Sequence, residues 1–382
     1  MSTVPTKTKK TAALCAVLSC LFLPLGQAAR AAETFQSPVT AAVLMDAASG
    51  EVLCELNSHA QHPPASMVKM MVALIVMENV RQGSLKLEEP ITVSARAAKI
   101  GGSQVYLKQG EVFTLEELMK AMMIHSANDA AVAIAEAVAG SVEAFVDLMN
   151  LKAKELGMND TVFHSVHGLP PGKGQQMDLS SAHDLALLGR RLVQEPRILG
   201  WTSRVEEPFR GGQFTLHNTN KILTRFRGMD GIKTGYIRES GFCITATAAR
   251  DGTRMIAVVL GATNDVMRTA ETTRLLSLGF NTYKTVTLAT AGQPLAKRLK
   301  VKKGKAPDLG VKYASDLRVS VKNDQVSQVV FADELPAEVE APVQEGTVLG
   351  KAEARLGDRV LGEVEILAAE TNEKASFWER LF

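Results

Sequence analysis

Pro64-Ala65-Ser66-Met67-Val68-Lys69 is the segment of this 382-residue chain from which the rest of the sequence is best understood. Ser66 and Lys69 are three residues apart in a helix predicted over 66–81, so their side chains lie one turn apart on the same face. A lysine buried at this position can lose its proton, because desolvation disfavours the charged form. The neutral amine could then act as a base toward the serine hydroxyl.

Two further motifs strengthen this interpretation, since an S-x-x-K pattern alone is common on exposed helices. Ser126-Ala127-Asn128 falls in a short break between helices predicted at 115–124 and 129–138, where a hydroxyl and an amide can point into a cleft. A helix N-cap is the alternative role. Lys233-Thr234-Gly235 lies at the entry to a predicted sheet, where glycine permits a ligand to approach the backbone closely. A plain edge strand is the alternative there.

The elements predicted around these motifs give an α/β (α+β) domain over residues 32–285. Apolar runs at 40–45 and 51–56 form one hairpin, and runs at 242–248 and 254–260, joined by Asp251-Gly252, form another. Helices are predicted at 142–156, at 179–193 with Asp178 or Ser180 as N-cap, and at 269–278. We therefore expect a mostly antiparallel sheet with a helical insertion.

The C-terminal third of the chain changes in character. Short strand-like runs at 317–321, 326–331 and 359–366 are separated by Gly, Pro and Asp, which predicts a small all-β domain over 286–368. Residues 369–382 are predicted to form an amphipathic membrane-association helix, because its four large apolar residues fall on one helical face. These are Phe377, Trp378, Leu381 and Phe382.

The N-terminal segment 1–31 has the features of a secretory signal peptide: basic residues at 7–10, an uncharged apolar run, and small residues ending at Ala31, where we place cleavage. A transmembrane anchor is the alternative, but Pro24 and Gly26 interrupt a run that is short for a bilayer span. A lipoprotein signal ending before Cys20 is disfavoured, since apolar residues 21–25 would remain in the mature chain.

Composition excludes several classes of protein. With 46% hydrophobic and 22% charged residues the chain is an ordinary globular protein, and removing residues 1–31 changes its net charge from +2 to about −2. This charge gives no reason to expect a nucleic-acid partner.

Cys54 and Cys243 lie in apolar strand-like runs, which favours two separate buried thiols over a disulfide. No CxxC or HExxH motif occurs, so we predict neither a metal nor a cofactor.

The order and spacing of the three motifs carry a family resemblance. An S-x-x-K motif, S-x-N about 60 residues later and K-T-G about 105 residues after that resemble the penicilloyl-serine transferases. The closest resemblance is to the low-molecular-mass penicillin-binding proteins that are serine-type D-alanyl-D-alanine carboxypeptidases, and it extends over about 34–370. Segments 101–107, 126–130, 167–169 and 233–236, together with the β domain and the amphipathic tail, are similar to that family. The resemblance implies a β-lactamase/transpeptidase-like catalytic domain.

The resemblance also implies a role for each motif residue. Ser66 would be the acylated nucleophile, Lys69 its general base, and Ser126 a proton relay toward the leaving amine. On the substrate-binding side, Asn128 would hold the substrate amide, Lys233 would supply positive potential, and Thr234 and Gly235 would contact the substrate. The backbone N–H groups of Ser66 and Tyr236 would meet the oxyanion. Arg268 would face the substrate carboxylate, with Arg254 and Arg274 as alternatives.

The implied activity is removal of the terminal D-Ala from peptidoglycan stem pentapeptides through a Ser66 acyl-enzyme, with β-lactam antibiotics acylating the same serine. The enzyme would lie in the periplasm, attached peripherally to the inner membrane through its C-terminal helix.

The motifs depart slightly from the family pattern: Ala127 stands where Gly is commoner, and Tyr236 where His also occurs. A DD-endopeptidase that cuts cross-links and a non-catalytic wall-binding scaffold are the alternatives. A β-lactamase based on Glu155 and Asn159 is disfavoured, because Glu155 ends a predicted helix.

Overall fold

The computed structural model describes residues 33–376. The predicted signal peptide, with its cleavage site and the two alternatives to it, lies outside the described residues. The same holds for residues 377–382, which include the four apolar residues of the predicted C-terminal helix.

A six-stranded sheet forms the centre of the N-terminal part. Its strand order is β1 (Glu33–Thr34), β3 (Val52–Leu56), β2 (Ala41–Asp46), β10 (Thr253–Ala262), β9 (Gly241–Arg250) and β8 (Met229–Ile237). All neighbouring pairs are antiparallel except the short pair β1–β3. The predicted hairpin about Asp251-Gly252 is present, and both turn residues have positive φ, as a two-residue turn between twisted strands requires.

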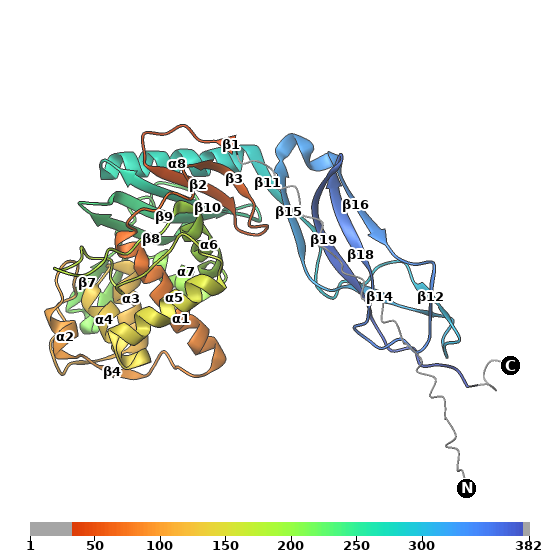
Figure 1. The fold of residues 1–382 in the computed structure, drawn as a ribbon, viewed down its shortest axis with the longest axis horizontal. Coiled ribbons are helices and arrows are strands. Elements are labelled where there is room, and N and C mark those ends of the chain that lie inside the picture. Colours follow the sequence, from red (N-terminus) through yellow and green to blue (C-terminus); the bar gives the residue numbers. More distant parts are fainter. Residues whose placement is uncertain (1–32, 377–382) are drawn as a thin grey trace, which may run out of the picture. The chain divides into compact units, whose positions relative to one another are not determined.

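Helices cover both faces of this sheet (Figure 1). Along β2 and β10 the side chains alternate: Val43 and Val258 pack with the helical insertion, whereas Leu44 and Val259 pack beneath α8 (Asp265–Thr282). The insertion contains α1 (Lys69–Gln82), α2 (Ala95–Lys99), α3 (Leu115–Ile124), α4 (Asn128–Ala139), α5 (Val142–Glu155), α6 (Ala182–Leu192) and α7 (Pro196–Thr202). Two small hairpins lie within it: β4 (Pro90–Thr92) with β5 (Val112–Thr114), and β6 (Glu206–Phe209) with β7 (Phe214–His217).

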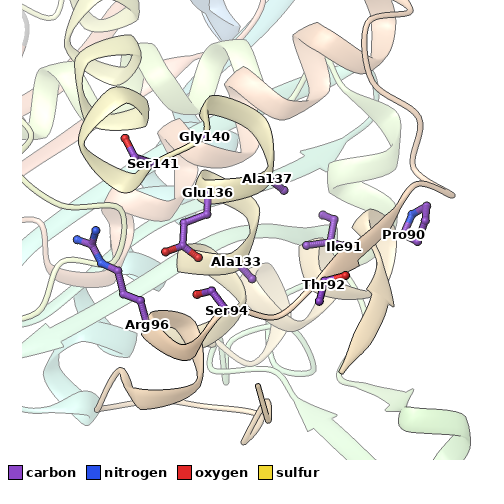
Figure 2. A pocket seen from close by; sticks show the side chains of 10 residues that line it. All are labelled: Pro90, Ile91, Thr92, Ser94, Arg96, Ala133, Glu136, Ala137, Gly140 and Ser141. Atoms are coloured by element: carbon purple, nitrogen blue, oxygen red, sulfur yellow. The ribbon is translucent and has the colours of Figure 1, made fainter. Parts of the chain in front are cut away.

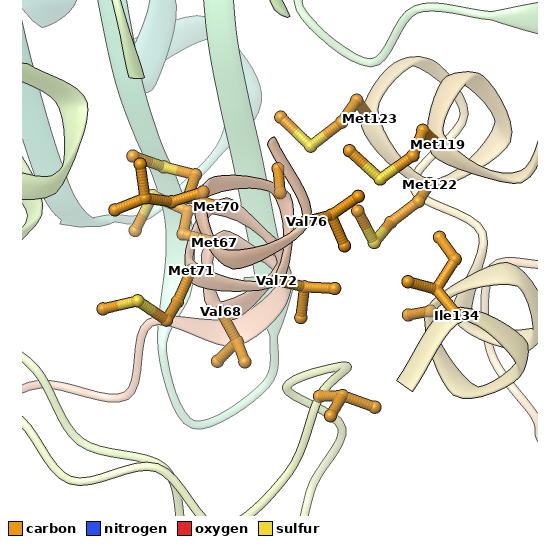
Figure 3. Close-up of a cluster of buried hydrophobic side chains, with 14 of the residues drawn as sticks. Met67, Val68, Met70, Met71, Val72, Val76, Met119, Met122, Met123 and Ile134 are labelled. Atoms are coloured by element: carbon orange, nitrogen blue, oxygen red, sulfur yellow. The ribbon is translucent and has the colours of Figure 1, made fainter. Parts of the chain in front are cut away.

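The central helix of the insertion is α1. Every residue from Lys69 to Glu78 is buried, which is the pattern of a helix surrounded by protein on all sides. Figure 3 shows Met70 and Met71 on one side of the helix, and Val72 and Val76 on the other side, where they face Met119 and Met122 of α3 and Ile134 of α4. Lys69 of the first motif therefore begins a helix that is fixed by the core, and Ser66 lies in the turn that leads into it.

A separate hydrophobic core organises the C-terminal β domain. Its strands are β11 (Tyr283–Ala289), β12 (Leu299–Lys302), β13 (Asp308–Leu309), β14 (Val311–Tyr313), β15 (Leu317–Lys322), β16 (Val329–Glu334), β17 (Glu338–Glu340), β18 (Val348–Leu356) and β19 (Arg359–Ala368). The largest sheet has the order β14-β19-β18-β16. The predicted fold class is thus confirmed in both parts: helices around an antiparallel sheet, followed by an all-β domain.

The boundaries predicted for the β domain and for the C-terminal helix were wrong. β11 begins at Tyr283, three residues before the predicted start at 286, because it pairs with β15. At the other end, residues 369–376 are not helical: Asn372 bridges to Val343 and donates a hydrogen bond of 2.9 Å to the carbonyl oxygen of Ala306. Asn372 and Ala375 are buried, so this segment belongs to the β domain.

Three smaller predictions also need correction. The helix predicted at 179–193 begins at Ala182 and is capped by Ser181, not by Asp178 or Ser180. The strand predicted at 326–331 is divided between a 3-10 helix, η3 (Asn323–Gln328), and β16. The last helix of the catalytic part is also longer than predicted, since α8 runs from Asp265 to Thr282. Cys54 and Cys243 are buried on opposite faces of the central sheet, in agreement with separate thiols.

Candidate active site

Ser66 lies in a 3-10 turn, η1 (Ala65–Val68), that leads into α1, where the sequence predicted the first turn of an α-helix. Residues three apart are nearly eclipsed in 3-10 geometry, so Ser66 and Lys69 point the same way. Ala65 has a φ of 48°, a left-handed conformation that costs a non-glycine residue about 1–3 kcal/mol. A strained turn of this kind is typical of a functional site.

Lys69 is fully buried, and its amine has three close neighbours. Its Nζ lies 3.0 Å from Ser66 Oγ, 2.7 Å from Asn128 Oδ1 and 2.8 Å from the carbonyl oxygen of His167. Burial, followed by the positive charge of Lys233, holds the pKa of Lys69 well below the ordinary lysine value. The neutral form of Lys69 is therefore favoured more than that of an exposed lysine.

This arrangement fixes the direction of proton transfer. The oxygens of Asn128 and His167 can only accept hydrogen bonds, so they take both N–H groups of a neutral Lys69 amine. Lys69 Nζ is also within hydrogen-bond distance of Ser66 Oγ, and in the neutral amine the remaining lone pair would be directed at this hydroxyl, which is the one neighbour of the three that can also donate. Lys69 is thus placed to receive the proton of Ser66 Oγ.

The second motif forms the wall of the site beside Lys69. Asn128 begins α4; its backbone N–H donates to Ser103 O at 2.7 Å, and its Nδ2 donates to Gly101 O, also at 2.7 Å. Ser126 is 4% exposed and has a φ of 67°, which places it in the predicted break between α3 and α4. Asn128 thus connects Lys69 to the segment 101–107, which is one of the segments that resemble the family.

The buried carboxylate of Asp178 holds the turn that carries His167, whose carbonyl oxygen is a neighbour of Lys69. Asp178 accepts hydrogen bonds from the backbone N–H groups of His164 and Ser165, at 2.6 and 2.9 Å, and from Ser165 Oγ at 2.6 Å. Ser165 Oγ in turn accepts from Gly168 N at 2.9 Å. These bonds hold the turn whose His167 carbonyl binds Lys69, and the His167 ring itself stays neutral because burial lowers its pKa to about 4.

The third motif lies in β8, the edge strand of the sheet; this location agrees with the edge-strand alternative and leaves the functional interpretation a prediction. Lys233 is 1% exposed, and its Nζ donates to Thr234 O at 3.0 Å. Burial and the nearby charge of Arg268 lower the pKa of Lys233 to about 7. Thr234 Oγ1 donates to Thr219 Oγ1 at 2.7 Å, and the exposed ring of Tyr236 packs against Phe242 at 4.4 Å between centroids.

Gly235 explains why the motif ends in glycine. A Cβ atom at this position would lie 2.6 Å from Pro64 O, which is closer than real Cβ atoms approach a backbone oxygen, and 3.2 Å from Ser66 N. The strand that carries Lys233 and Thr234 can therefore pass directly against the turn that carries Ser66 only if residue 235 has no side chain.

The structure separates the three arginines that the sequence left open. Arg254 is engaged by Asp230, with two N–O distances of 2.8 and 2.7 Å, and Arg274 pairs with Glu271 at 2.7 Å. Arg268 pairs with Asp265 and is largely buried, and it is the one whose charge lowers the pKa of Lys233. Arg268 also donates a hydrogen bond of 3.4 Å to Cys243 O, and Cys243 pairs with Gly235 of the third motif, so of the three arginines Arg268 is the best candidate for the predicted role.

A cavity of about 490 Å³ lies elsewhere, between β4, α2 and the second half of α4 (Figure 2). In this view Arg96 and Glu136 lie at one end, and Pro90 and Ile91 at the other. None of the motif residues lines this cavity. We place the candidate active site at the three motifs and not at the cavity, since a buried amine 3.0 Å from a serine hydroxyl is an arrangement that can activate a nucleophile.

A family model described as D-alanyl-D-alanine carboxypeptidase matches residues 27–264, which is more than half of the chain. The chain belongs to this family. A second model, described as the C-terminal domain of penicillin-binding protein 5, matches residues 283–374 of this carboxypeptidase.

Individual proteins agree with the family assignment. D-alanyl-D-alanine carboxypeptidase DacF of Bacillus subtilis is 37% identical to this carboxypeptidase over 340 residues, covering 88% of this chain and 86% of its own. DacC of Escherichia coli is 32% identical over 378 residues, covering 95% and 92%. The crystal structure of penicillin-binding protein 5 from Haemophilus influenzae superimposes with a TM-score of 0.79 at 27% identity, covering 89% of this chain and 99% of that one.

One further structure is informative because it holds an antibiotic. A penicillin-binding protein from Listeria monocytogenes, solved in its ampicillin-bound form, is 32% identical, with a TM-score of 0.59, and covers 64% of this chain and 98% of its own. The predictions of a D-Ala-D-Ala carboxypeptidase, of its family and of its fold are therefore confirmed.

Some residues that shape the site of this carboxypeptidase were not found from its sequence. Asp178 was predicted only as a helix cap, and Thr219, which accepts the hydrogen bond of Thr234, was not predicted at all. His167 and Gly168 were part of a recognised segment, but His167 contributes a backbone carbonyl to the site, and Gly168 leaves room for Ala65 O, which a Cβ atom would meet at 2.0 Å. The His167-Gly168 pair was the signal in the sequence for this turn.

Proposed function

We propose that Ser66 is the nucleophile with which the enzyme removes the terminal D-Ala from stem pentapeptides. Ser66 Oγ attacks the carbonyl carbon between the two D-Ala residues while its proton passes to Lys69 Nζ. The proton then reaches the leaving amine, with Ser126 as the relay, and D-Ala departs; water hydrolyses the resulting ester. The observation that carries this proposal is the 3.0 Å distance between Ser66 Oγ and a buried Lys69 whose other two neighbours are carbonyl oxygens.

The surroundings of Ser66 support a binding mode for the peptide. The backbone N–H groups of Ser66 and Tyr236 would stabilise the oxyanion, because β8 and η1 meet at Gly235. Asn128 would hold the substrate amide, and Lys233, Thr234 and Arg268 would bind the terminal carboxylate.

β-Lactam antibiotics would acylate the same serine. A β-lactam presents an acyl carbon and a carboxylate to the same groups as the peptide, and the related Listeria protein was solved in an ampicillin-bound form. Peptidoglycan stem peptides and β-lactams are thus the partners we propose for Ser66.

The test is to incubate the protein with a stem pentapeptide and, separately, with a fluorescent penicillin. We expect release of D-Ala and a covalent label that peptide mass mapping places on Ser66. A cross-linked muropeptide dimer, assayed in parallel, would be cleaved more slowly than D-Ala is released. Faster cleavage of the dimer would favour an endopeptidase, and the absence of any label would contradict an acyl-enzyme.

The two active-site lysines predict a bell-shaped dependence of kcat/KM on pH. The rising limb reflects loss of the Lys69 proton, because burial and Lys233 lower the pKa of Lys69. The falling limb reflects loss of the Lys233 charge. Since the pKa of Lys233 is about 7, kcat/KM should fall about tenfold per pH unit above that value. Rates of acylation by subsaturating penicillin, measured in buffers across this pH range, give the profile.

Lys233→Arg provides the matched variant for this profile. A guanidinium stays charged at all pH values of interest, so the falling limb should disappear while the rising limb remains. A falling limb that persists unchanged in Lys233→Arg would show that another group controls it.

We further propose that the enzyme acts in the periplasm, attached to the surface of the inner membrane. The basic and apolar segment 1–31 supports export, and the apolar residues Phe377, Trp378, Leu381 and Phe382 support peripheral attachment. Each of these could contribute about 2 kcal/mol at most by burial in the interface. Within residues 33–376 there is no helix of the length and apolar character needed to cross a bilayer.

Deletion of residues 377–382 tests the attachment. Truncation at this point leaves Asn372 and Ala375, which are buried in the β domain, in place. We expect the truncated enzyme in the soluble periplasmic fraction after cell fractionation, whereas the control variant Glu379→Gln stays with the membrane. Unchanged membrane retention of the truncated enzyme would identify an uncleaved segment 1–31 as the anchor.

A further inference from the structure

Tyr106 combines two unusual properties for an aromatic residue. Its side chain is 69% exposed, and its φ is 57°. The left-handed conformation is costly for a bulky residue, and an exposed ring gains little from burial that would offset that cost. The fold therefore holds Tyr106 in place for a reason other than packing of its side chain.

The residues on both sides of Tyr106 are bound to one carboxylate. Asp129, which is 1% exposed and follows Asn128 at the start of α4, accepts hydrogen bonds from Val105 N at 3.1 Å and from Leu107 N at 3.0 Å. The backbone at 105–107 is thus fixed to the helix that carries the second motif.

A second contact holds the backbone of Tyr106 itself. Arg210 Nη2 donates to Tyr106 O at 2.9 Å, and the same guanidinium binds Glu111 through two bonds of 2.6 and 2.9 Å. The guanidinium carbon lies 4.9 Å from the ring centroid of Phe113. Arg210 also has a left-handed φ, of 54°. Two strained residues are therefore joined by a hydrogen bond.

The segment that carries Tyr106 is part of the active-site wall. Gly101 O and Ser103 O both accept hydrogen bonds from Asn128, whose Oδ1 binds Lys69. A Cβ at Gly102 would lie 2.6 Å from Asn128 Nδ2, so the segment and the second motif are in direct contact. The backbone that carries Tyr106 is therefore continuous with the segment that contacts Asn128, the residue we propose to hold the substrate amide.

We propose that Tyr106 is a specificity-determining residue: a fixed aromatic surface against which an apolar part of the acyl donor packs, at the side of the site formed by Asn128. Arg210 is the positioning residue that holds it. Tyrosine suits this role because it offers a large contact area with few rotatable bonds. This inference rests on the proposed function, since it assigns a contact to the same substrate.

The test compares three variants at position 106 in the D-Ala release assay. Tyr106→Ala should raise KM about tenfold with little change in kcat, the loss expected for one aromatic contact. Tyr106→Phe should keep the wild-type KM. Tyr106→Gly should show the same KM as Tyr106→Ala while melting at or above the wild-type temperature, because glycine adopts this φ without strain. Val330→Ala, at an exposed apolar residue of β16, is the control and should change nothing.

Acylation by two penicillins separates this inference from the proposed function. Tyr106→Ala should slow acylation of Ser66 by a penicillin with an aromatic acyl side chain, but not by the free penicillin nucleus, which has no such side chain. A wild-type enzyme that neither releases D-Ala nor is acylated would overturn the proposed function. An active wild type whose kinetics are unchanged by Tyr106→Ala would overturn the role of Tyr106 alone.

Arg210→Lys tests whether Arg210 acts through Tyr106. Lysine keeps the charge but cannot bind Glu111 and Tyr106 O with a planar fork. We expect Arg210→Lys alone to raise KM. Added to Tyr106→Ala, it should cause no further increase in KM. Additive effects of the two substitutions would contradict a positioning role for Arg210.

Discussion

Replacing Lys69 by Met should lower the rate of Ser66 acylation about 10³- to 10⁴-fold, the upper range for removal of a general base. Methionine has a similar length and fills the buried space, but it has no lone pair of comparable basicity and no charge. The Ser66 hydroxyl would then have no base for its proton, since the remaining neighbours of the amine, Asn128 Oδ1 and the His167 carbonyl oxygen, are amide oxygens of very low basicity. The acylation rate with a fluorescent penicillin measures the effect.

A second substitution distinguishes base catalysis from a purely electrostatic role. Lys69→Arg keeps positive charge and hydrogen-bond donors, but a guanidinium cannot be deprotonated in a protein. If Lys69 acts as a base, this variant is as inactive as Lys69→Met. Activity of Lys69→Arg within tenfold of wild type would contradict the role of a base.

Stability of the Lys69 variants must be measured alongside their activity. Lys69→Met leaves two buried oxygens without a donor, at a cost of about 1–3 kcal/mol each, so a lower melting temperature is expected. Circular dichroism should still show a folded enzyme, because α1 is buried by apolar residues on all sides. Lys154→Met, on the exposed side of α5, serves as the matched control and should leave both properties unchanged.

The location of the site could be predicted from sequence because its side chains occur in short motifs with fixed spacing. Ser66 and Lys69 are neighbours on one turn, so local geometry is sufficient to bring them together. Asn128 reaches Lys69 only through the tertiary fold, and there the family resemblance, not the spacing itself, supplied the expectation. The antiparallel sheet followed from the hairpin at Asp251-Gly252, where the turn residues determine the pairing.

The parts that could not be predicted depend on backbone atoms and on choices among equivalent residues. Every residue has a carbonyl oxygen, so nothing in the sequence marks that of His167 as a partner of Lys69. Asp178 and Ser181 are both residue types that favour the N-cap position. Asp178 instead accepts a hydrogen bond from the turn at 164–165, and Ser181 caps α6. Similarly, the polar segment 369–376 resembled the start of a helix, but Asn372 finds buried backbone partners in the β domain.

Gly235→Ala should lower kcat/KM about 100-fold or more while the enzyme remains folded. The new Cβ would lie 2.6 Å from Pro64 O, and both are attached to backbone that is held by neighbours: β8 by its pairing with β9, and η1 by the buried start of α1. Relief of the contact moves the two segments apart, and small displacements of reacting groups are sufficient for losses of this size. The proposed oxyanion donors, the N–H groups of Ser66 and Tyr236, lie on opposite sides of this contact, so their spacing changes directly.

Gly200→Ala is the matched control for this substitution. Gly200 lies in α7, where a new Cβ atom would meet no other atom within 4 Å, and alanine favours a helix over glycine by about 1 kcal/mol. Its activity should equal that of wild type and its melting temperature should not fall, whereas Gly235→Ala should lose about 1–3 kcal/mol of stability through overpacking. If Gly235→Ala acylates Ser66 at the wild-type rate, the separation between β8 and η1 does not control the oxyanion site. We expect the loss of activity of Gly235→Ala to exceed what its loss of stability explains. The folded variant should still bind penicillin, but its displaced backbone donors would stabilise the tetrahedral intermediate poorly.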